Sequence, residues 1–452
     1  MRASFFRSIL IYFLFLGLIF FSSCSTTVNY FRYNMVDVYD IDEPLYQKRR
    51  VVFPTDSTSF RFEKADKEKS LDNKIKLGQE PEISFEEILA TRGKTQSFLW
   101  IQNDTIVSEK YYDKADAAKP INVMSVSKSI VATCFGIAQT KGLMDPEEEV
   151  RKYLPELNPK IKDLKIKDLL NMQAGFRHHE YRGSLTPFGK VIGLYYGPDI
   201  YKYSDKKSIP AYSPGQKYHY QSMATVLLTR CIAAASGTSF EDFVYQELIL
   251  PLDFEYSSLW ATDMALHPKG FAGFSVTARD LAKIGRLYLQ GGNWNGKQIL
   301  SKEFVDQIFS VQPTNGGYYH YSFRTNMKFT PVLKEEIKEN PMLVAQKAVQ
   351  TGATLFLWNK DYYLAEPYPI KDVYAVGVLG NFLYMDPSTQ TIIVRTGNQL
   401  SSGDVDWNQL FRALVRGESY IDNQSRGIAI TIEEIDPTSL VDQQPKKRRK
   451  NN

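Results

Sequence analysis

The chain has 452 residues, of which 43% are hydrophobic and 23% are charged, so it can bury a large core and is not a disordered protein. Its formal net charge is +4. Removing the two arginines of the N-terminal segment and the five basic residues of the C-terminal tail, Lys446 to Lys450, leaves a net charge of −3 for the remainder. Because nucleic-acid-binding domains carry a basic surface patch, we expect no nucleic-acid partner.

The N-terminal segment has the pattern of a secretory signal. Arg2 and Arg7 precede an apolar run over residues 9–21, which is shorter than the roughly 20 residues that a membrane span needs. The residues Phe-Ser-Ser before Cys24 resemble the processing site of bacterial lipoproteins, in which the cysteine becomes the lipidated N-terminus. We predict a lipid-anchored protein of the bacterial cell envelope, held to a membrane through Cys24. A plain secretory signal or a short anchor is the alternative.

The order of the expected elements divides the chain into four segments. A signal peptide (1–23) is followed by an irregular N-terminal extension (24–85), a single large folded domain (86–430) and a basic tail (431–452). The extension is polar and charge-rich, and the tail carries the five basic residues, which we expect to be solvated near an anionic membrane surface.

Within the domain, strand patterns lie near both ends and helical patterns lie between them. A hairpin is expected over 97–112, an apolar helix over 124–141, helices over 145–250 and 276–310, and two strands within 382–394. The charged segment 324–352 is expected to be a surface insertion. This order predicts one α+β domain, with an antiparallel sheet flanked by helices and an all-helical lobe.

The sequence from Ser125 to Lys128 is a Ser-x-x-Lys motif at the start of the apolar helix. Residues three apart share a helix face, so the Lys128 amine can reach the Ser125 hydroxyl. A serine is a weak nucleophile unless a neighbouring base takes its proton, and the positive end of the helix dipole favours a developing negative charge. Ser204 and Lys207 have the same spacing but lie in an expected polar loop, so we favour Ser125 as the nucleophile.

Tyr220 lies where a polar loop meets an apolar helix. A nearby lysine ammonium would lower the pKa of its phenol from about 10 and make the phenolate available as a base. Taken alone, Tyr220 is better explained as one structural tyrosine among 28, and it is the other motifs that favour a catalytic role.

Two glycines, Gly377 and Gly380, precede the first C-terminal strand. Glycine lets a strand backbone approach a ligand closely and present an N–H group to an oxyanion. A simple bulge is the alternative interpretation.

In this order, Ser-x-x-Lys, Tyr-x-Ser and a glycine-flanked strand resemble the serine β-lactamase and penicillin-binding-protein superfamily. Within it, the chain is most similar to the class C-related serine hydrolases that include 6-aminohexanoate-dimer hydrolase. Further similar segments, among them 168–175, 274–281 and 383–387, extend the resemblance over roughly residues 95 to 400. The resemblance implies a β-lactamase/DD-peptidase-like fold and a serine hydrolase, without a cofactor, that cleaves amide or ester bonds through an acyl-enzyme.

The resemblance also implies roles for single residues. Ser125 would be the acylated nucleophile and Lys128 its proton partner, while Tyr220 would act as base toward the serine and as acid toward the leaving group. The backbone N–H groups of Ser125 and of Asn381, which follows Gly380, would form the oxyanion hole. Ser222 takes the place of the asparagine in the usual Tyr-x-Asn motif and is expected to contact substrate.

Val378 occupies a position where the superfamily usually has Lys or His. Because such a cation would pair with a substrate carboxylate, its loss predicts that neutral amides and esters are better substrates than carboxylated β-lactams. Two alternatives to a hydrolase of small or peptide-like amides and esters stay open. One is a catalytically silent scaffold that binds envelope peptides or a partner protein, and the other is a D-amino-acid peptidase of the cell envelope.

The remaining reactive residue types favour structural roles. Cys134 and Cys231 lie among apolar residues, so we expect buried free thiols rather than a disulfide. His178 and His179 adjoin Glu180, but no further ligand stands at metal spacing, so we predict no metal site.

Overall fold

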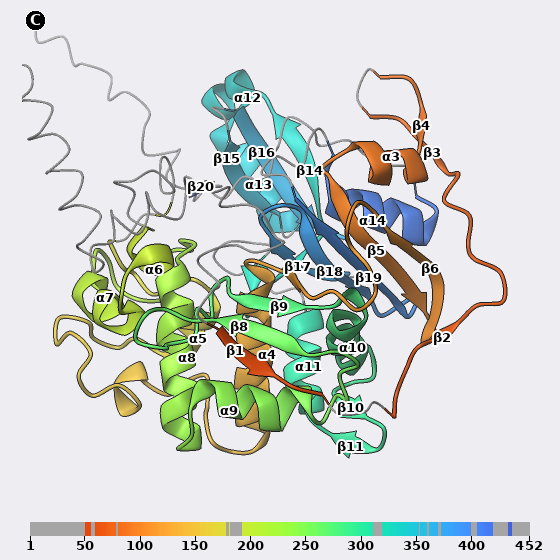
Figure 1. Ribbon diagram of the computed structural model, residues 1–452. Coiled ribbons are helices and arrows are strands. Elements are labelled where there is room, and N and C mark those ends of the chain that lie inside the picture. Colours follow the sequence, from red (N-terminus) through yellow and green to blue (C-terminus); the bar gives the residue numbers. More distant parts are fainter. Residues whose placement is uncertain are drawn as a thin grey trace, which may run out of the picture.

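The computed structural model describes residues 50–55, 59–77, 80–177, 180, 192–310, 319–351, 353–358, 361–368, 372–398, 405–418 and 433–435. Its centre is an eight-stranded sheet of order β12-β13-β17-β18-β19-β5-β6-β2, antiparallel except where β2 meets β6 (Figure 1). The strands are β2 (Glu63–Lys64), β5 (Thr95–Gln102), β6 (Thr105–Tyr111), β12 (Tyr319–His320), β13 (Phe323–Thr325), β17 (Val373–Gly377), β18 (Asn381–Asp386) and β19 (Thr391–Gly397).

Strands from opposite ends of the chain share this sheet, as predicted. β19 pairs with β5, so that Ile392 lies opposite Ile101. β5 and β6 form the expected hairpin, and its turn residues Asn103 and Asp104 have φ angles of 51° and 61°. Asn and Asp tolerate this left-handed backbone better than most residues, which makes the two-residue turn possible.

Side chains alternate across the sheet and fill two apolar cores. Phe98 and Trp100 pack against α3 (Phe85–Thr91) and α14 (Trp407–Arg416) on one face. Leu99 and Ile101 belong to a larger core on the other face, with α4 (Val126–Thr140) and α10 (Ala278–Leu289). Because helices cover both faces of the sheet, the sequence of β5 is a nearly continuous apolar run.

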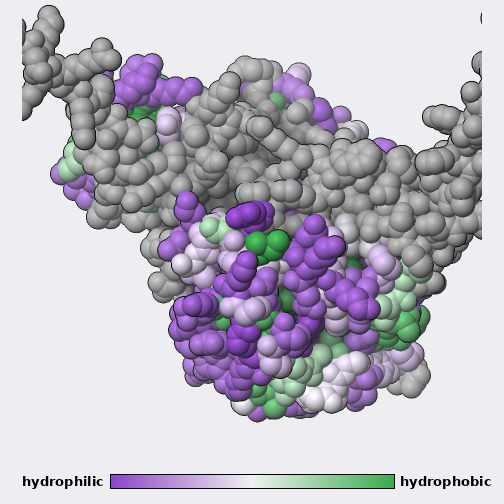
Figure 2. All heavy atoms as spheres, turned by 90° about the vertical axis from the view of Figure 1, so that its left-hand side faces the viewer, coloured by the Kyte–Doolittle hydropathy of each residue, from purple (hydrophilic) through white to green (hydrophobic). Residues whose placement is uncertain are grey.

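The all-helical lobe predicted for 145–250 consists of helices and turns in its described part. Its elements are a 3-10 turn (Val150–Lys152), α5 (Ile166–Leu170), α6 (Ile192–Tyr196), α7 (Ile200–Lys207), α8 (Ser222–Ser236), α9 (Phe240–Val244) and a π-helical turn (Tyr245–Ile249). The outer face of the molecule on this side is mostly hydrophilic, with small scattered hydrophobic patches (Figure 2). Most of α8 is buried, so the lobe turns its apolar side chains inward.

Among the described residues, no single helix is long and apolar enough to cross a membrane. One pair, Ser222–Ser236 with Phe240–Ile249, reaches the required length and apolarity together, but it bends by 79°.

The described part of the N-terminal extension belongs to the fold rather than forming the irregular lead-in that the sequence predicts. β1 (Arg50–Phe53) pairs with β8 (Ser258–Ala261) in a second sheet of order β1-β8-β9-β7, with β7 at Ile121–Asn122 and β9 at Phe274–Val276. Phe53 and Phe62 are buried in the larger core. Two short strands, β3 (Lys74–Ile75) and β4 (Ile83–Ser84), form a ribbon before α3. The predicted boundary at residue 86 therefore does not separate two structural units.

The charged segment expected as a surface insertion extends further than predicted and has its own small core. It forms a four-stranded sheet of order β14-β16-β15-β20 beside two helices, at the top of Figure 1. Its elements are β14 (Met327–Val332), α12 (Lys334–Glu339), α13 (Pro341–Thr351), β15 (Thr354–Trp358), β16 (Asp361–Pro367) and β20 (Glu433–Ile435). β20 lies in the segment predicted as the basic tail.

A small hairpin and one further helix complete the described elements. β10 (Asn293–Trp294) and β11 (Lys297–Gln298) form a small hairpin before α11 (Lys302–Phe309). Cys134 and Cys231 are buried and free, as predicted. The signal segment, Cys24 and the run Lys446 to Lys450 lie outside the described residues.

Candidate active site

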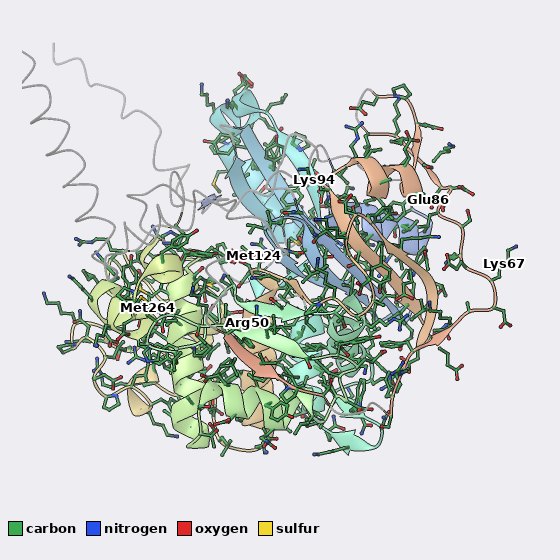
Figure 3. All side chains as sticks on the ribbon, viewed as in Figure 1. Arg50, Lys67, Glu86, Lys94, Met124 and Met264 are labelled. Atoms are coloured by element: carbon green, nitrogen blue, oxygen red, sulfur yellow. The ribbon has the colours of Figure 1, made fainter. Side chains whose placement is uncertain are left out.

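Ser125 stands at the start of α4, at a backbone position that its neighbours hold in place. Met124, directly before it, has a φ of 51°, and its N–H donates to Asn122 Oδ1 at 2.7 Å. Met124 lies near the centre of the molecule, between the sheet and the helical lobe (Figure 3). Ser125 is only partly buried, and its hydroxyl makes no helix-capping bond. The hydroxyl is therefore available for chemistry at a rigidly held point.

Lys128 lies one turn along α4, and the predicted contact with Ser125 is present. Its Nζ is 3.1 Å from Ser125 Oγ and donates to the Phe271 carbonyl oxygen at 2.7 Å. Burial lowers the pKa of Lys128 from 10.5 to about 7, while the Glu180 carboxylate raises it and Arg324 lowers it further. An amine with this pKa is partly neutral near pH 7 and can accept a proton there.

Tyr220 completes the predicted trio, but its protonation differs from the expectation. Its hydroxyl forms a hydrogen bond with the Ser125 side chain, and its ring centroid is 4.9 Å from Lys128 Nζ. Burial raises the pKa of Tyr220 above its usual value of 10, although the bond to Ser125 acts in the other direction. The expected lowering by a lysine ammonium is wrong, because removing the phenol from water disfavours the phenolate more than its neighbours favour it. Near neutral pH, Tyr220 is a proton donor.

The loop before α8 fixes Tyr220 through its two neighbours. The His219 N–H donates to the Met172 carbonyl at 2.7 Å, and Gln221 Nε2 donates to the Phe176 carbonyl at 2.8 Å. Both carbonyls belong to the segment that follows α5. The similar segment 168–175 that the sequence singles out is therefore part of the support for Tyr220.

The polar groups of Ser222 are hydrogen-bonded to Glu180, a residue that the sequence did not mark as functional. Its hydroxyl donates to Glu180 Oε2 at 2.9 Å, and its backbone N–H donates to Glu180 Oε1. Glu180 is buried. No sequence spacing connects positions 180 and 222, and the two histidines that drew attention to Glu180 lie outside the described residues.

The structure favours a different glycine as the one beside Ser125. A Cβ atom on Gly377 would lie 3.0 Å from the Ser125 backbone nitrogen and 2.3 Å from the Val123 carbonyl oxygen. Only a glycine at the end of β17 permits this approach. Gly377, rather than Gly380 as predicted, is therefore the glycine beside Ser125, and this favours the N–H of Val378 over that of Asn381 for the oxyanion hole.

Gly380 and Asn381 instead hold the turn that carries Val378. Arg395 Nη1, which is buried, donates to the Gly380 carbonyl at 2.5 Å, and a Cβ on Gly380 would lie 2.2 Å from that nitrogen. The Asn381 side chain donates to the Val378 carbonyl at 2.9 Å and to the Asn122 carbonyl at 3.4 Å. These bonds connect the turn to the backbone just before Ser125.

The second Ser-x-x-Lys sequence has a structural role. It forms the last turn of α7 rather than the polar loop expected, and Ser204 is buried there. The Ser204 hydroxyl donates to the Tyr201 carbonyl at 2.7 Å and accepts from Arg230 Nη1 at 3.1 Å. A serine with both functions occupied is a poor nucleophile.

One group among the described residues has the composition of a metal site. Asp199, Asp263 and His267 place one ligand atom each within 4.8 Å of one another in the helical lobe. Both carboxylates already accept backbone hydrogen bonds at the start of α7, from Lys202 and Ile200 at 2.9 and 2.7 Å. The group therefore has a capping role, and it lies apart from the hydrogen bonds that join Ser125, Lys128 and Tyr220.

The chain is similar to several known proteins. The family model described as Beta-lactamase matches residues 89–414. The 6-aminohexanoate-dimer hydrolase of Paenarthrobacter ureafaciens is 23% identical over 325 residues, which cover 70% of this chain and 76% of that protein. A solved structure of a candidate 6-aminohexanoate-dimer hydrolase from Bacillus anthracis has a TM-score of 0.66 at 20% identity, covering 84% of this chain and 96% of that one. The octameric penicillin-binding protein homologue from Pyrococcus abyssi has a TM-score of 0.51 at 16% identity, covering 75% and 77%. The predicted superfamily and fold class are confirmed.

Proposed function

This chain belongs to the Beta-lactamase family, and on that premise we propose that it is a serine hydrolase that cleaves an amide or ester bond through an acyl-enzyme on Ser125. One observation carries the proposal: the Ser125 hydroxyl contacts both Lys128 Nζ, at 3.1 Å, and the Tyr220 hydroxyl. A nucleophile needs a base within hydrogen-bond reach, and its leaving group needs an acid. A silent scaffold would have no use for this arrangement.

Acylation follows from the protonation states of the three residues. Neutral Lys128 accepts the Ser125 proton while Ser125 Oγ forms a bond to the substrate carbonyl carbon. The backbone N–H groups of Ser125 and Val378 stabilise the resulting oxyanion. When the tetrahedral intermediate collapses, the bond to the leaving group breaks, and the Tyr220 phenol protonates the departing alcohol or amine. The Lys128 ammonium then returns a proton to Tyr220.

Deacylation uses the same groups with water as the nucleophile. Lys128, neutral again, accepts a proton from water as the water oxygen attacks the acyl carbon. The bond to Ser125 Oγ breaks, and the proton passes from Lys128 to the serine oxygen. The products are a carboxylic acid and the restored hydroxyl, so every proton is accounted for.

The substrate preference is tested with esters and a cephalosporin. With no cation at Val378, or at Ala375 three residues earlier, we expect p-nitrophenyl acetate or butyrate to be hydrolysed with a higher kcat/KM than a chromogenic cephalosporin, by about tenfold or more, because the carboxylate loses a charge-assisted partner. Efficient cephalosporin hydrolysis by the unaltered protein would contradict the preference. No turnover of any ester or amide would contradict the enzyme itself and favour a scaffold.

We also propose that Cys24 is lipidated and holds the protein on a membrane of the cell envelope. The support is the basic N-terminus, the short apolar run and the small residues before Cys24. Cys24→Ala is expected to release the protein into the soluble fraction or to leave the signal uncleaved, whereas Cys134→Ala should not change its location. Cell fractionation measures the release, and the intact mass shows whether the signal was cleaved. Membrane retention of a cleaved Cys24→Ala protein would contradict lipidation.

A further inference from the structure

The start of α8, directly after Tyr220, is held by a carboxylate from a distant part of the chain. Gln221 is the N-cap residue of α8, yet its side chain makes no capping bond and donates to the Phe176 carbonyl instead. Glu180 takes over this role. It accepts hydrogen bonds from the Ser222 N–H, from the Ser222 hydroxyl at 2.9 Å and from the Met223 N–H. The orphan donors of the first helical turn are thereby satisfied.

This carboxylate is costly to bury. Glu180 is only 8% exposed, and burial raises its pKa above the usual range. Its three donors and the positive end of the α8 dipole oppose that effect, because each favours the charged form. A serine at position 221, where Gln221 is itself buried, would cap the helix without burying any charge. The position of Glu180 therefore calls for an explanation beyond helix capping.

The explanation lies in the electrostatic surroundings of Lys128. The charged or titratable groups that act on its ammonium are Glu180, which raises the pKa of Lys128, and Arg324 on β13, which lowers it, while the Tyr220 ring faces it at 4.9 Å. The coupling is mutual, because Lys128 lowers the pKa of Glu180. Both side chains are buried, so their charges are weakly screened.

From this arrangement we propose that Glu180 is a positioning residue of the hydrolase. Its carboxylate fixes the turn from Tyr220 to Ser222 against Ser125, and its negative charge sets the pH at which Lys128 becomes a base. Ser222, in the position of the usual asparagine, has a single hydroxyl proton and gives it to Glu180. Where the usual motif has a neutral asparagine side chain, this protein therefore has a serine that is hydrogen-bonded to a buried carboxylate. The inference rests on the proposed function.

The test measures how fast a fluorophosphonate probe labels Ser125 as a function of pH, because labelling needs the activated nucleophile but no knowledge of the natural substrate. The variants are Glu180→Gln, which removes the charge at constant size, and Glu180→Asp, which keeps the charge but shortens its reach to Ser222. Glu156→Gln is the matched control, since Glu156 is a half-exposed lobe glutamate that pairs with Arg230. Melting temperatures of all four proteins are recorded.

For the unaltered protein, labelling should rise with pH around the pKa of Lys128, near 7. Glu180→Gln is expected to move this midpoint down by about one pH unit, since an opposite charge is lost. Glu180→Asp should keep the midpoint within a few tenths of a unit and slow labelling by about tenfold. Glu156→Gln should change neither.

Three results would overturn the inference while leaving the hydrolase intact. They are an unshifted midpoint in Glu180→Gln, a shift of equal size in Glu156→Gln, and unchanged labelling rates in Glu180→Asp. If Glu180→Gln does not fold, Glu180→Asp alone decides through its rate and midpoint. Failure of the unaltered protein to label at Ser125 is a different outcome, and it contradicts the proposed function together with this inference.

Discussion

Ser125→Ala is expected to abolish fluorophosphonate labelling and to lower ester hydrolysis by at least about 10⁴-fold, because Ser125 is the nucleophile of the proposed acyl-enzyme. KM should change little, since the binding groups stay in place. The measurements are steady-state hydrolysis of p-nitrophenyl butyrate and mass mapping of the labelled peptide. Alanine fits the partly buried position without strain, so the variant should melt at nearly the same temperature as the unaltered protein.

The matched control for Ser125 is Ser204→Ala, which changes the other serine with Ser-x-x-Lys spacing. Its hydroxyl is engaged with the Tyr201 carbonyl and Arg230, so labelling and turnover should persist. Ester hydrolysis that survives in Ser125→Ala would sink the nucleophile assignment. Labelling that disappears only in Ser204→Ala would transfer the role to α7.

Lys128→Met is expected to lower kcat/KM for the same ester by about 10²–10⁴-fold, because the general base is lost while the apolar volume is kept. The unaltered protein should show kcat/KM rising with pH around 7, as Lys128 loses its proton. In Lys128→Met this rise should vanish. A rise near pH 7 that persists in the variant would assign the titration to another group.

The same variant should be more heat-stable near neutral pH. The folded pKa of Lys128 lies below the unfolded value, so between about pH 7 and 10.5 the unfolded chain binds more protons, and the stability of the unaltered protein rises with pH there. Lys128→Met removes this penalty. Its melting temperature should exceed that of the unaltered protein at pH 6–7, and the difference should shrink toward pH 10. Calorimetry at several pH values measures both trends.

Local sequence patterns were sufficient for much of the fold. The apolar run Phe98 to Ile101, the Asn103–Asp104 turn and the apolar run after Ser125 each determine their element through nearest neighbours. The short strand Arg50–Phe53 could not be recognised in this way. It is a strand because β8 supplies its hydrogen-bond partners, and that partner lies about 200 residues later in the chain.

In the site, too, local contacts could be predicted from the sequence, whereas contacts between distant segments could not. Ser125 and Lys128 are linked by helix geometry, so their contact followed from spacing alone. The acceptor for Lys128 is the Phe271 backbone carbonyl, a group that every residue has and that no residue type reveals. The pKa of Tyr220 depends on burial, which the sequence around it does not express. The register of the glycine turn was misjudged by three residues, because Gly377 and Gly380 are both plausible until the position of the Ser125 nitrogen is known.

The first strand that the structure describes, β1, begins at Arg50 and is paired with β8. With Cys24 as the lipidated terminus, only 25 residues lie between Cys24 and that strand. A chain of this length spans at most about 90 Å when fully extended, at roughly 3.3–3.6 Å per residue. The hydrolase would therefore act only on substrates that lie within this distance of its membrane. Inserting a flexible segment before Arg50 would increase the distance that the enzyme can reach from the membrane, without altering the chemistry at Ser125.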